Sequence, residues 1–381
     1  RELLATGTTL LATTAEEQAA VRAAFNAFDG GFAATPDTAE VIRIISGHIN
    51  NTYCVMEAAS GRKFIVQKLN TIFDIAAIDN NLQRLEEAQV LRRDRLPAWW
   101  QPVHYLNVAG QAGKIFYDAG GAGWRVMHFV PGDIRIFNTF SQVPAAQQAA
   151  VARSQGEAIA IFGDMLDAFP ADAWQEPLPN FHNGQYHLDY LHAILSGEDV
   201  VLSLSRDTSR RVTLDRTMRM RYACRTETLL AKVAAHAGLL TALDHLGKTV
   251  AHGDTKLNNF VFRRDGDSWR AVCLIDLDTV QRGNMLDDLG DALRYAGNPA
   301  GEEPASPDDV RIDETVVANI VDGYAGEMTA RYGPERGALL RDNALRAFAL
   351  FLYQQCLRFF ADSLAGNAYW KLKPGMAEDI N

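Results

Sequence analysis

The first third of the chain alternates apolar and polar positions in the manner of half-buried strands. Short apolar runs bounded by turn residues predict four strands, at residues 41–45, 52–56, 63–69 and 124–130. The turn-like residues 46–51 join the first two strands into a predicted β-hairpin, and the Pro-Gly-Asp turn at residues 131–133 ends the fourth. Between the third and fourth strands, residues 78–94 place apolar side chains at helical spacing.

Helical spacing dominates the rest of the chain. Helices are predicted at residues 145–169, at 187–246 with a break near Gly197, and at 311–332 and 336–364. Two short strands, at 261–262 and 272–275, flank the Asp-Gly-Asp turn at 265–267. We expect an α+β chain with three parts, namely an N-terminal helical segment (1–35), a small β-rich lobe (36–131) and a larger helical lobe (132–381).

Composition and charge narrow the classes of function. Apolar residues make up 48% of the 381 residues and charged residues 22%, which is ordinary for a globular protein. The net charge is −10 and basic runs are short, so nucleic-acid binding is not expected. No apolar run approaches the length of a membrane span, and no obligate protein partner is indicated. The four cysteines form no C-x-x-C pair, which argues against a zinc site or disulfide framework and favours a reducing cytoplasm.

One polar segment, residues 252–259, carries the pattern H-x-D-x-K-x-x-N between two apolar stretches. Phosphoryl transfer requires a carboxylate near the attacking hydroxyl, a cation on the phosphate and oxygen ligands for Mg²⁺. Asp254 can accept or orient the hydroxyl proton, Lys256 can reach the phosphate, and Asn259 can bind Mg²⁺ through its amide oxygen. His252 is expected to hold the loop by hydrogen bonding rather than to act as a base.

A second pattern, I-D-x-D at residues 275–278, closes an apolar strand. Asp276 can bind Mg²⁺ with its carboxylate, whereas Asp278 can either support the metal or bond the loop backbone. The two patterns together correspond to the signature set of kinases, with I-D-x-D in the place of D-F-G. The joint spacing predicts a protein-kinase-like fold that transfers the γ-phosphate of a nucleotide with the help of Mg²⁺. A structural Asp-Asn turn and a non-catalytic kinase fold are the alternatives.

The residues resemble the aminoglycoside phosphotransferase and choline kinase superfamily, and within it the N-acetylhexosamine 1-kinases. The resembling stretches are 47–53, 64–70, 124–129, 252–259, 275–279, 287–295 and 358–362. They span most of the chain from about residue 41 to residue 370, with a loose match at 185–245. The resemblance implies the use of ATP and Mg²⁺ and phosphorylation of the anomeric hydroxyl of an N-acetylated hexose, with Asp254 facing that hydroxyl.

The resemblance also implies individual binding residues. Sugar contacts are expected from His48 in the hairpin turn and Arg358 in the last helix, with Tyr295 as a wall of the sugar site. The alternatives are a turn histidine, a surface arginine and a core tyrosine. Met127 and Phe129, at the end of the fourth strand, are expected to contact the nucleotide.

The third strand departs from the usual kinase pattern. Matching residues 64–67 to the V-A-I-K pattern puts Gln67 in the position of the lysine that normally contacts phosphate. Lys68 then faces solvent, because successive strand residues point to opposite faces. Glu87 matches the helix glutamate that normally pairs with that lysine, but its partner here is an amide. Whether Gln67 replaces the lysine stays open at this point.

Rival functions share the same fold. A kinase acting on another sugar, an aminoglycoside or an amino alcohol is the nearest alternative, although cationic acceptors call for acidic or aromatic sites, which an inward Arg358 disfavours. A protein kinase is less consistent, since no A-P-E segment follows Asp276. A nucleotide-binding pseudokinase is the alternative from a different class. The sequence thus predicts an ATP-dependent small-molecule kinase with a sugar substrate.

Overall fold

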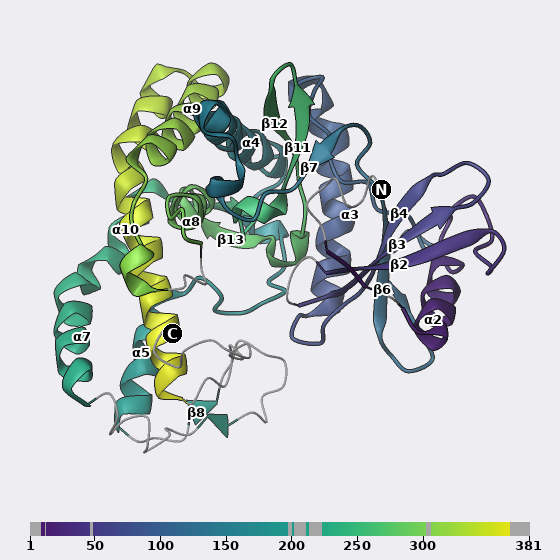
Figure 1. The fold of residues 1–381 in the computed structure, drawn as a ribbon. Coiled ribbons are helices and arrows are strands. Elements are labelled where there is room, and N and C mark those ends of the chain that lie inside the picture. The colour runs from purple at the N-terminus through teal and green to yellow at the C-terminus, as the bar shows by residue number, and fades with distance from the viewer. Residues whose placement is uncertain are drawn as a thin grey trace.

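The computed structural model describes residues 9–11, 13–45, 49–196, 200–201, 211–212, 223–301 and 306–365. The small lobe is built on a six-stranded antiparallel sheet with the strand order β1-β2-β3-β4-β6-β5. Its strands are β1 (Thr9–Leu11), β2 (Ala39–Ile45), β3 (Asn51–Glu57), β4 (Lys63–Lys68), β5 (Phe116–Tyr117) and β6 (Gly123–His128). Figure 1 shows this lobe beside a larger, mainly helical one.

Two helices lie on opposite sides of the small-lobe sheet (Figure 1). Helix α2 (Ala15–Phe25) covers the outer face and begins with a capping box, in which Thr14 and Glu17 bond each other's backbone N–H. Helix α3 (Ile75–Arg92) lies between the sheet and the larger lobe, and the side chain of Asp74 caps its first turn.

The strand register sorts the side chains of the small lobe onto two faces. Directly opposed residues of neighbouring antiparallel strands lie on the same face. The outer face packs against α2 through a buried cluster that includes Tyr53, Val55, Phe64, Val66 and Val126. The inner face looks toward α3 and the larger lobe and carries two cross-strand rows. The first row is Ile42, Cys54, Ile65 and Met127; the second is Ile44, Thr52, Gln67 and Arg125.

Residues 129–133 join the lobes, running from β6 to β7 (Ile134–Arg135). Strand β7 pairs with β11 (Phe260–Asp265), which pairs in turn with β12 (Ser268–Leu274). A second two-stranded ribbon is formed by β10 (Lys248–Ala251) and β13 (Gln281–Asn284). Strands β8 (Val200–Val201) and β9 (Arg211–Val212) form a further short pair.

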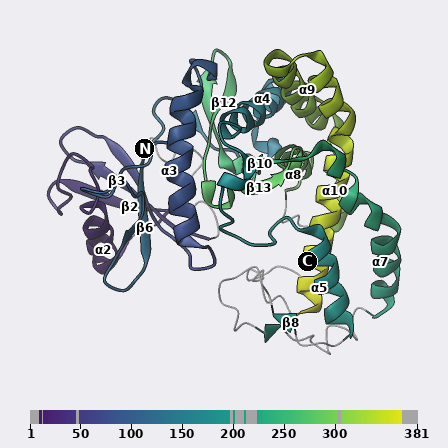
Figure 2. The same ribbon diagram turned by 180° about the vertical axis from the view of Figure 1, so that it is seen from behind.

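The β10–β13 ribbon lies among helices of the larger lobe, whereas the β8–β9 pair lies at its edge (Figure 2). These helices are α4 (Gln148–Leu166), α5 (Gly184–Ser196), α7 (Ala223–His236), α8 (Asp287–Ala296), α9 (Glu314–Tyr332) and α10 (Pro334–Leu364). Helices α4 and α9 approach each other through reciprocal glycines. A β-carbon at Gly156 would overlap the carbonyl oxygen of Ile320, and one at Gly323 would overlap that of Arg153. Across the described part of the chain, no helix combines the length and apolarity that a bilayer span requires.

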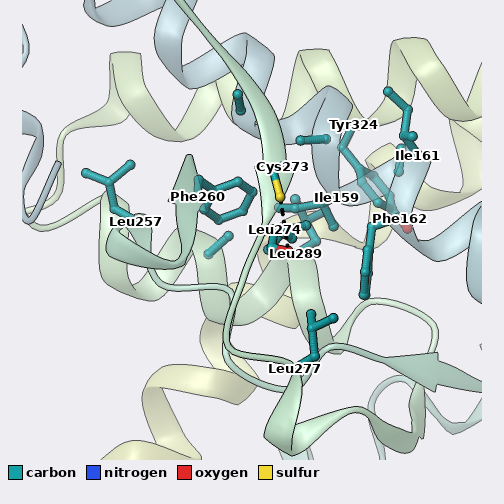
Figure 3. Close-up of a cluster of buried hydrophobic side chains, with 14 of the residues drawn as sticks. Ile159, Ile161, Phe162, Leu257, Phe260, Cys273, Leu274, Leu277, Leu289 and Tyr324 are labelled. Carbon is teal, nitrogen blue, oxygen red and sulfur yellow. Dashed lines mark hydrogen bonds between the residues drawn. The ribbon is translucent and has the colours of Figure 1, made fainter. Parts of the chain in front are cut away.

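A buried apolar cluster supports the strands that carry the polar motifs (Figure 3). Phe260 of β11, Leu274 of β12, Leu289 of α8 and Ile159 of α4 belong to this cluster, and each is at most 3% exposed. Cys273, also buried there, lies near the end of β12 (Figure 3). Because interiors of this kind are close-packed and resist deformation, the loops that leave β10, β11 and β12 start from fixed points.

The structure confirms the predicted two-lobed α+β fold and corrects several predicted elements. Within residues 1–35 it forms strand β1 as well as α2, and both pack on the small-lobe sheet rather than forming a separate helical segment. The helical pattern at 187–246 is wrong in part, since the structure contains β8 and β9 there. Strands β10 and β13 were not predicted, because each is only four residues long and neither alternates regularly.

Candidate active site

The loop of residues 252–259, called here the catalytic loop, follows β10 and is held by two buried aspartates of α8. The carboxylate of Asp288 accepts hydrogen bonds from the backbone N–H groups of His252 and Gly253, at 2.8 and 2.9 Å. The carboxylate of Asp291 accepts one from the N–H of Thr255, at 2.8 Å. Charge-assisted bonds of this kind are stronger than neutral ones. Helix α8 therefore fixes the backbone on both sides of Asp254.

His252 and Gly253 link the catalytic loop to the I-D-x-D segment at residues 275–278. The Nδ1 atom of His252 accepts from the backbone N–H of Asp254 at 3.2 Å, so Nε2 carries the proton and donates to the carbonyl of Ile275 at 3.0 Å. Gly253 has φ = +80°, and a β-carbon there would lie 2.7 Å from the carbonyl oxygen of Thr279. A neutral, doubly bonded imidazole serves to hold the loop and leaves no nitrogen for proton transfer.

Three predicted residues meet at the carboxylate of Asp254. Lys256 Nζ lies 2.7 Å from Asp254 Oδ2, and Asn259 Nδ2 donates to the same oxygen at 3.0 Å and to the carbonyl of Asp254 at 2.7 Å. Burial alone would raise the pKa of Asp254, but the ammonium of Lys256 outweighs it and lowers this pKa below the ordinary value. Asp254 is therefore an anion at neutral pH, with Oδ1 able to accept a hydroxyl proton.

Asp276 follows β12 in a left-handed conformation, with φ = 64° and ψ = 60°. Such a backbone costs a non-glycine residue about 1–2 kcal/mol and is typical of functional sites. Burial, and next the neighbouring carboxylate of Asp278, raises the pKa of Asp276 to about 6. The backbone N–H of Ile275 donates to the carbonyl of Asn259 at 2.9 Å, which brings Asp276 close to the catalytic loop.

The residues around Asp276 suit a hard cation. Asn259 uses its amide nitrogen for both of its hydrogen bonds, so its amide oxygen is the atom that can bind a metal. The buried carboxylate of Asp276 provides a second oxygen of the kind that Mg²⁺ prefers. Two protein oxygens are a usual set for Mg²⁺ where waters and phosphate oxygens supply the remaining ligands.

Asp278, a candidate for the same metal, has different partners in the structure. Its Oδ1 forms an ion pair with Nη1 of Arg125, and its Oδ2 accepts from Nδ2 of Asn50 at 2.6 Å. The residue is only 1% exposed. Because both oxygens are engaged by side chains of the small lobe, the assignment of Asp278 as a metal ligand is corrected to a buried tie between the lobes.

The inner face of the small-lobe sheet carries the predicted nucleotide residues. Met127 is buried in the first row, beside Ile65. Phe129 is half-buried and packs with Ile65 on the small cluster that contains Ile44 and Cys54. Ile65 and Phe129 also pack against the main buried cluster, which includes residues of both lobes. This apolar patch lies next to the polar row that contains Gln67, so a flat base and its phosphates have neighbouring surfaces of the appropriate kinds.

Gln67 lies on the inner face as predicted, but its predicted helix partner does not meet it. The amide of Gln67 contacts Thr52 and Arg125, at 3.1 and 2.9 Å. Glu87 is exposed, and the carboxylate of α3 that pairs with a small-lobe lysine is instead Glu86, 2.6 Å from Lys114. The assignment of Glu87 to the nucleotide site is therefore wrong, because helical periodicity turns other residues of α3 toward the sheet.

The three residues predicted to contact the sugar have different outcomes in the structure. His48 lies outside the described residues. Tyr295 is buried and its hydroxyl donates to the carbonyl of Asn138 at 3.1 Å, which is the packing of a core tyrosine and gives no support for a wall of the sugar site. Arg358 is half-buried, with its guanidinium 4.6 Å from the ring centre of Phe181. Of the two that the structure describes, Arg358 is the one linked to the catalytic loop.

The link from Arg358 to the catalytic loop is His182, which the sequence did not single out. Its ring lies 4.4 Å from the ring of Phe181, and its Nε2 is 2.5 Å from the carbonyl oxygen of Gly253. Burial lowers the pKa of His182, and the nearby charge of Arg358 adds to this effect. His182 occurs in a polar connecting segment without a motif, so no local signal distinguished it from an ordinary surface histidine.

Comparisons with known proteins identify the family of this chain. The phosphotransferase enzyme family matches residues 40–334. Similar solved structures are a choline kinase from Cryptosporidium parvum Iowa II, with 12% identity and a TM-score of 0.49 over 92% of this chain and 90% of that one, and the GDP complex of aminoglycoside 2'-phosphotransferase-IIIa, with 15% identity and a TM-score of 0.48 over 87% of each. A microcompartment-associated aminopropanol kinase has 13% identity and a TM-score of 0.46, over 92% and 96%. Since the family match covers most of the chain and includes both polar motifs, this protein belongs to the phosphotransferase enzyme family.

Proposed function

We propose that the protein transfers the γ-phosphate of ATP to a sugar hydroxyl, and specifically to the anomeric hydroxyl of an N-acetylhexosamine. The observation that carries the proposal is the arrangement at Asp254. A single anionic carboxylate is held by Lys256 and Asn259 beside Asp276, with one oxygen left for an acceptor hydroxyl. These are the parts that in-line phosphoryl transfer needs on the acceptor side.

Asp254 orients the acceptor hydroxyl and takes its proton as the bond to phosphorus forms. A carboxylate with a lowered pKa is a weak base, and it suits a relatively acidic hydroxyl better than an ordinary alcohol. The anomeric hydroxyl of a sugar is a hemiacetal and is more acidic than the other hydroxyls. The lowered pKa of Asp254 therefore favours transfer to the anomeric position.

Lys256, Asn259 and Asp276 act on the phosphate side. Lys256 lies within 2.7 Å of Asp254 and its charge also reaches Asp276, so it can shift between the carboxylates and the γ-phosphate. Asn259 and Asp276 would hold Mg²⁺, which neutralises charge on the β- and γ-phosphates when it is bound. The base of the nucleotide would lie against Ile65 and Phe129 on the inner face.

The charges near the catalytic loop favour a neutral acceptor over a cationic one. The field of Arg294, which pairs with Asp291 at 2.7 Å, lowers the pKa of Asp254. Arg358 acts similarly on His187. Burial lowers the pKa of His187 to about 3, and the charge of Arg358 adds to this effect. A quaternary ammonium or a polyamine would meet repulsion from Arg358, whereas the charge of Arg294 is offset by Asp291. A neutral sugar can instead bond the guanidinium of Arg358 and stack on Phe181.

A reducing compartment is part of the same proposal. Cys54 and Cys273 are buried, and burial raises the pKa of each thiol to about 12. Thiols of this kind stay protonated and unreactive, so they serve as packing residues in a cytoplasm that also supplies ATP.

The test is an acceptor panel with the purified protein, ATP and Mg²⁺, read out as ADP release. N-acetylglucosamine, N-acetylgalactosamine and glucose would be compared with choline, ethanolamine and kanamycin. We expect turnover with an N-acetylhexosamine and a phosphate on carbon 1, located by phosphorus NMR. The Asp254→Asn variant is the control for contaminating activity. Turnover confined to the amino alcohols or the aminoglycoside would refute the proposed acceptor while leaving the kinase chemistry intact.

A further inference from the structure

The second row of the inner face forms a continuous polar chain across three strands. Thr52 of β3, Gln67 of β4 and Arg125 of β6 are directly opposed in the sheet register. Gln67 Nε2 donates to Thr52 Oγ1 at 3.1 Å, and Arg125 Nε donates to Gln67 Oε1 at 2.9 Å. The position that normally holds a phosphate-binding lysine is therefore bonded directly to a cation on the neighbouring strand.

This contact fixes which end of the Gln67 amide faces which neighbour. An arginine Nε is only a donor, so the atom that it contacts must be the amide oxygen. The amide nitrogen must then point toward Thr52, which accepts one of its two N–H groups. The half-buried amide keeps a second N–H that Thr52 does not use, which is a donor suited to a phosphate oxygen.

Arg125 is fully buried, with 0% of its surface exposed, and it needs a compensating charge. The carboxylate of Asp278 provides that charge, and the ring of Tyr105 lies 5.5 Å from the guanidinium carbon. Nη2 of Arg125 is also buried, and no group among the described residues accepts a hydrogen bond from it. Because Arg125 has no exposed surface, its charge acts on the polar row through Gln67 and not by direct contact with a ligand.

Asp278 connects this cation to the site of chemistry. It lies two residues after Asp276, in the 3-10 turn Leu277–Thr279 of the larger lobe. Its other oxygen accepts from Asn50, which follows the hairpin turn of the small lobe. The pair of Arg125 and Asp278 resembles the lysine–glutamate pair of other kinases, in which a carboxylate holds a cation of the sheet. Here, however, the cation comes from β6 and not from the third strand, and the carboxylate comes from the larger lobe and not from a small-lobe helix.

We propose that Arg125 carries the positive charge of the phosphate site in place of a third-strand lysine, with Gln67 and Asp278 holding it in position. The inference rests on the use of a nucleotide proposed above, but not on the identity of the acceptor. Arg125 is fully buried and acts through Gln67: the second amide N–H of Gln67 is the group that pairs with a phosphate oxygen, and the charge of Arg125 behind it strengthens that bond.

The test measures binding of Mg²⁺–ATP and of adenosine to the full-length protein by calorimetry, with no acceptor present. Arg125→Gln removes the charge, and we expect ATP to bind about 30-fold more weakly, the size of one lost charge-assisted interaction. Adenosine has no phosphate, so its affinity should stay within a few fold. Lys114→Gln is the matched control, since it removes a buried small-lobe cation that pairs with Glu86 instead.

A charge relocation keeps the inference testable if Arg125→Gln proves unstable. In the double variant Gln67→Lys with Arg125→Gln, the cation lies on the third strand at position 67, directly opposite position 125 in the sheet. We expect this variant to recover at least a third of the lost ATP affinity on a logarithmic scale. Equal weakening of ATP and adenosine would overturn the inference, as would a double variant that binds ATP no better than Arg125→Gln, or unchanged ATP binding in a folded Arg125→Gln protein. These outcomes can be interpreted even if no sugar in the acceptor panel is phosphorylated, because the binding measurements contain no acceptor.

Discussion

Substituting alanine for Gly253 tests whether the backbone next to Asp254 controls activity. Gly253 has φ = +80°, which costs a residue with a β-carbon about 1–2 kcal/mol. The new β-carbon would also lie 2.7 Å from the carbonyl oxygen of Thr279. That carbonyl cannot easily move away, because the hydroxyl of Thr279 donates to the carbonyl of His252 at 2.8 Å.

The expected result is a loop displaced by a few tenths of an ångström at the catalytic carboxylate. Small misplacements at a reacting group cost up to about 100-fold in rate. We therefore expect kcat of Gly253→Ala to fall between about 10-fold and 100-fold. Gly121→Ala is the matched control, since it has φ = +79° and nothing lies within 4 Å of its β-carbon position.

Both variants would be compared by ADP release and by thermal unfolding. The two share the conformational cost, so both should lower the melting temperature, whereas only Gly253→Ala should lose kcat. The reasoning is refuted if the two variants have the same activity, because the contact with Thr279 would then have no effect on Asp254.

Three further predictions concern the groups around the acceptor and the metal. Asp254→Ala should abolish phosphoryl transfer while leaving ATP affinity within a few fold, as measured by calorimetry; near-normal turnover would contradict its role as the acceptor base. Arg358→Ala should raise KM for the sugar more than KM for ATP, and equal effects on both would argue against a sugar contact. The pKa of Asp276 is raised to about 6, so a proton competes with the metal below that value. The Mg²⁺ concentration needed for half-maximal rate should therefore rise as pH falls through about 6, and a requirement independent of pH would exclude Asp276 as a ligand.

The sequence was most informative where chemistry and local structure share one short segment. Asp254, Lys256 and Asn259 lie within six residues, and the hydrogen bonds among them form inside the loop between β10 and β11. The four longer strands of the small lobe were predicted because their alternation reflects one buried outer face, whereas the short strands β1 and β5 were not. The two-lobed arrangement followed from these strands and the helical remainder.

Pairings between distant residues could not be predicted in the same way. Arg125 and Asp278 are 153 positions apart, and Asn50 and Asp278 are 228 apart. Their contacts depend on strand register and on how the lobes meet, neither of which alternation specifies. The error at Glu87 has a related cause, since a helix pattern shows that one face is apolar but not which neighbouring carboxylate turns toward the sheet.

The glycine contact between α4 and α9 affects how variants of this protein would be interpreted. Gly156 and Gly323 lie on two helices whose backbones touch, and a side chain at either would force the helices apart. The core behind the catalytic loop includes Ile159 of α4 and Ile320 of α9, so such a change would reach the site through packing alone. In a screen for inactive variants, substitutions at these glycines would resemble lesions of the chemistry although neither residue contacts a substrate. Measuring the yield of folded protein together with turnover would separate loss of packing from loss of catalysis. It would also show how poorly the contact between these two helices tolerates substitution.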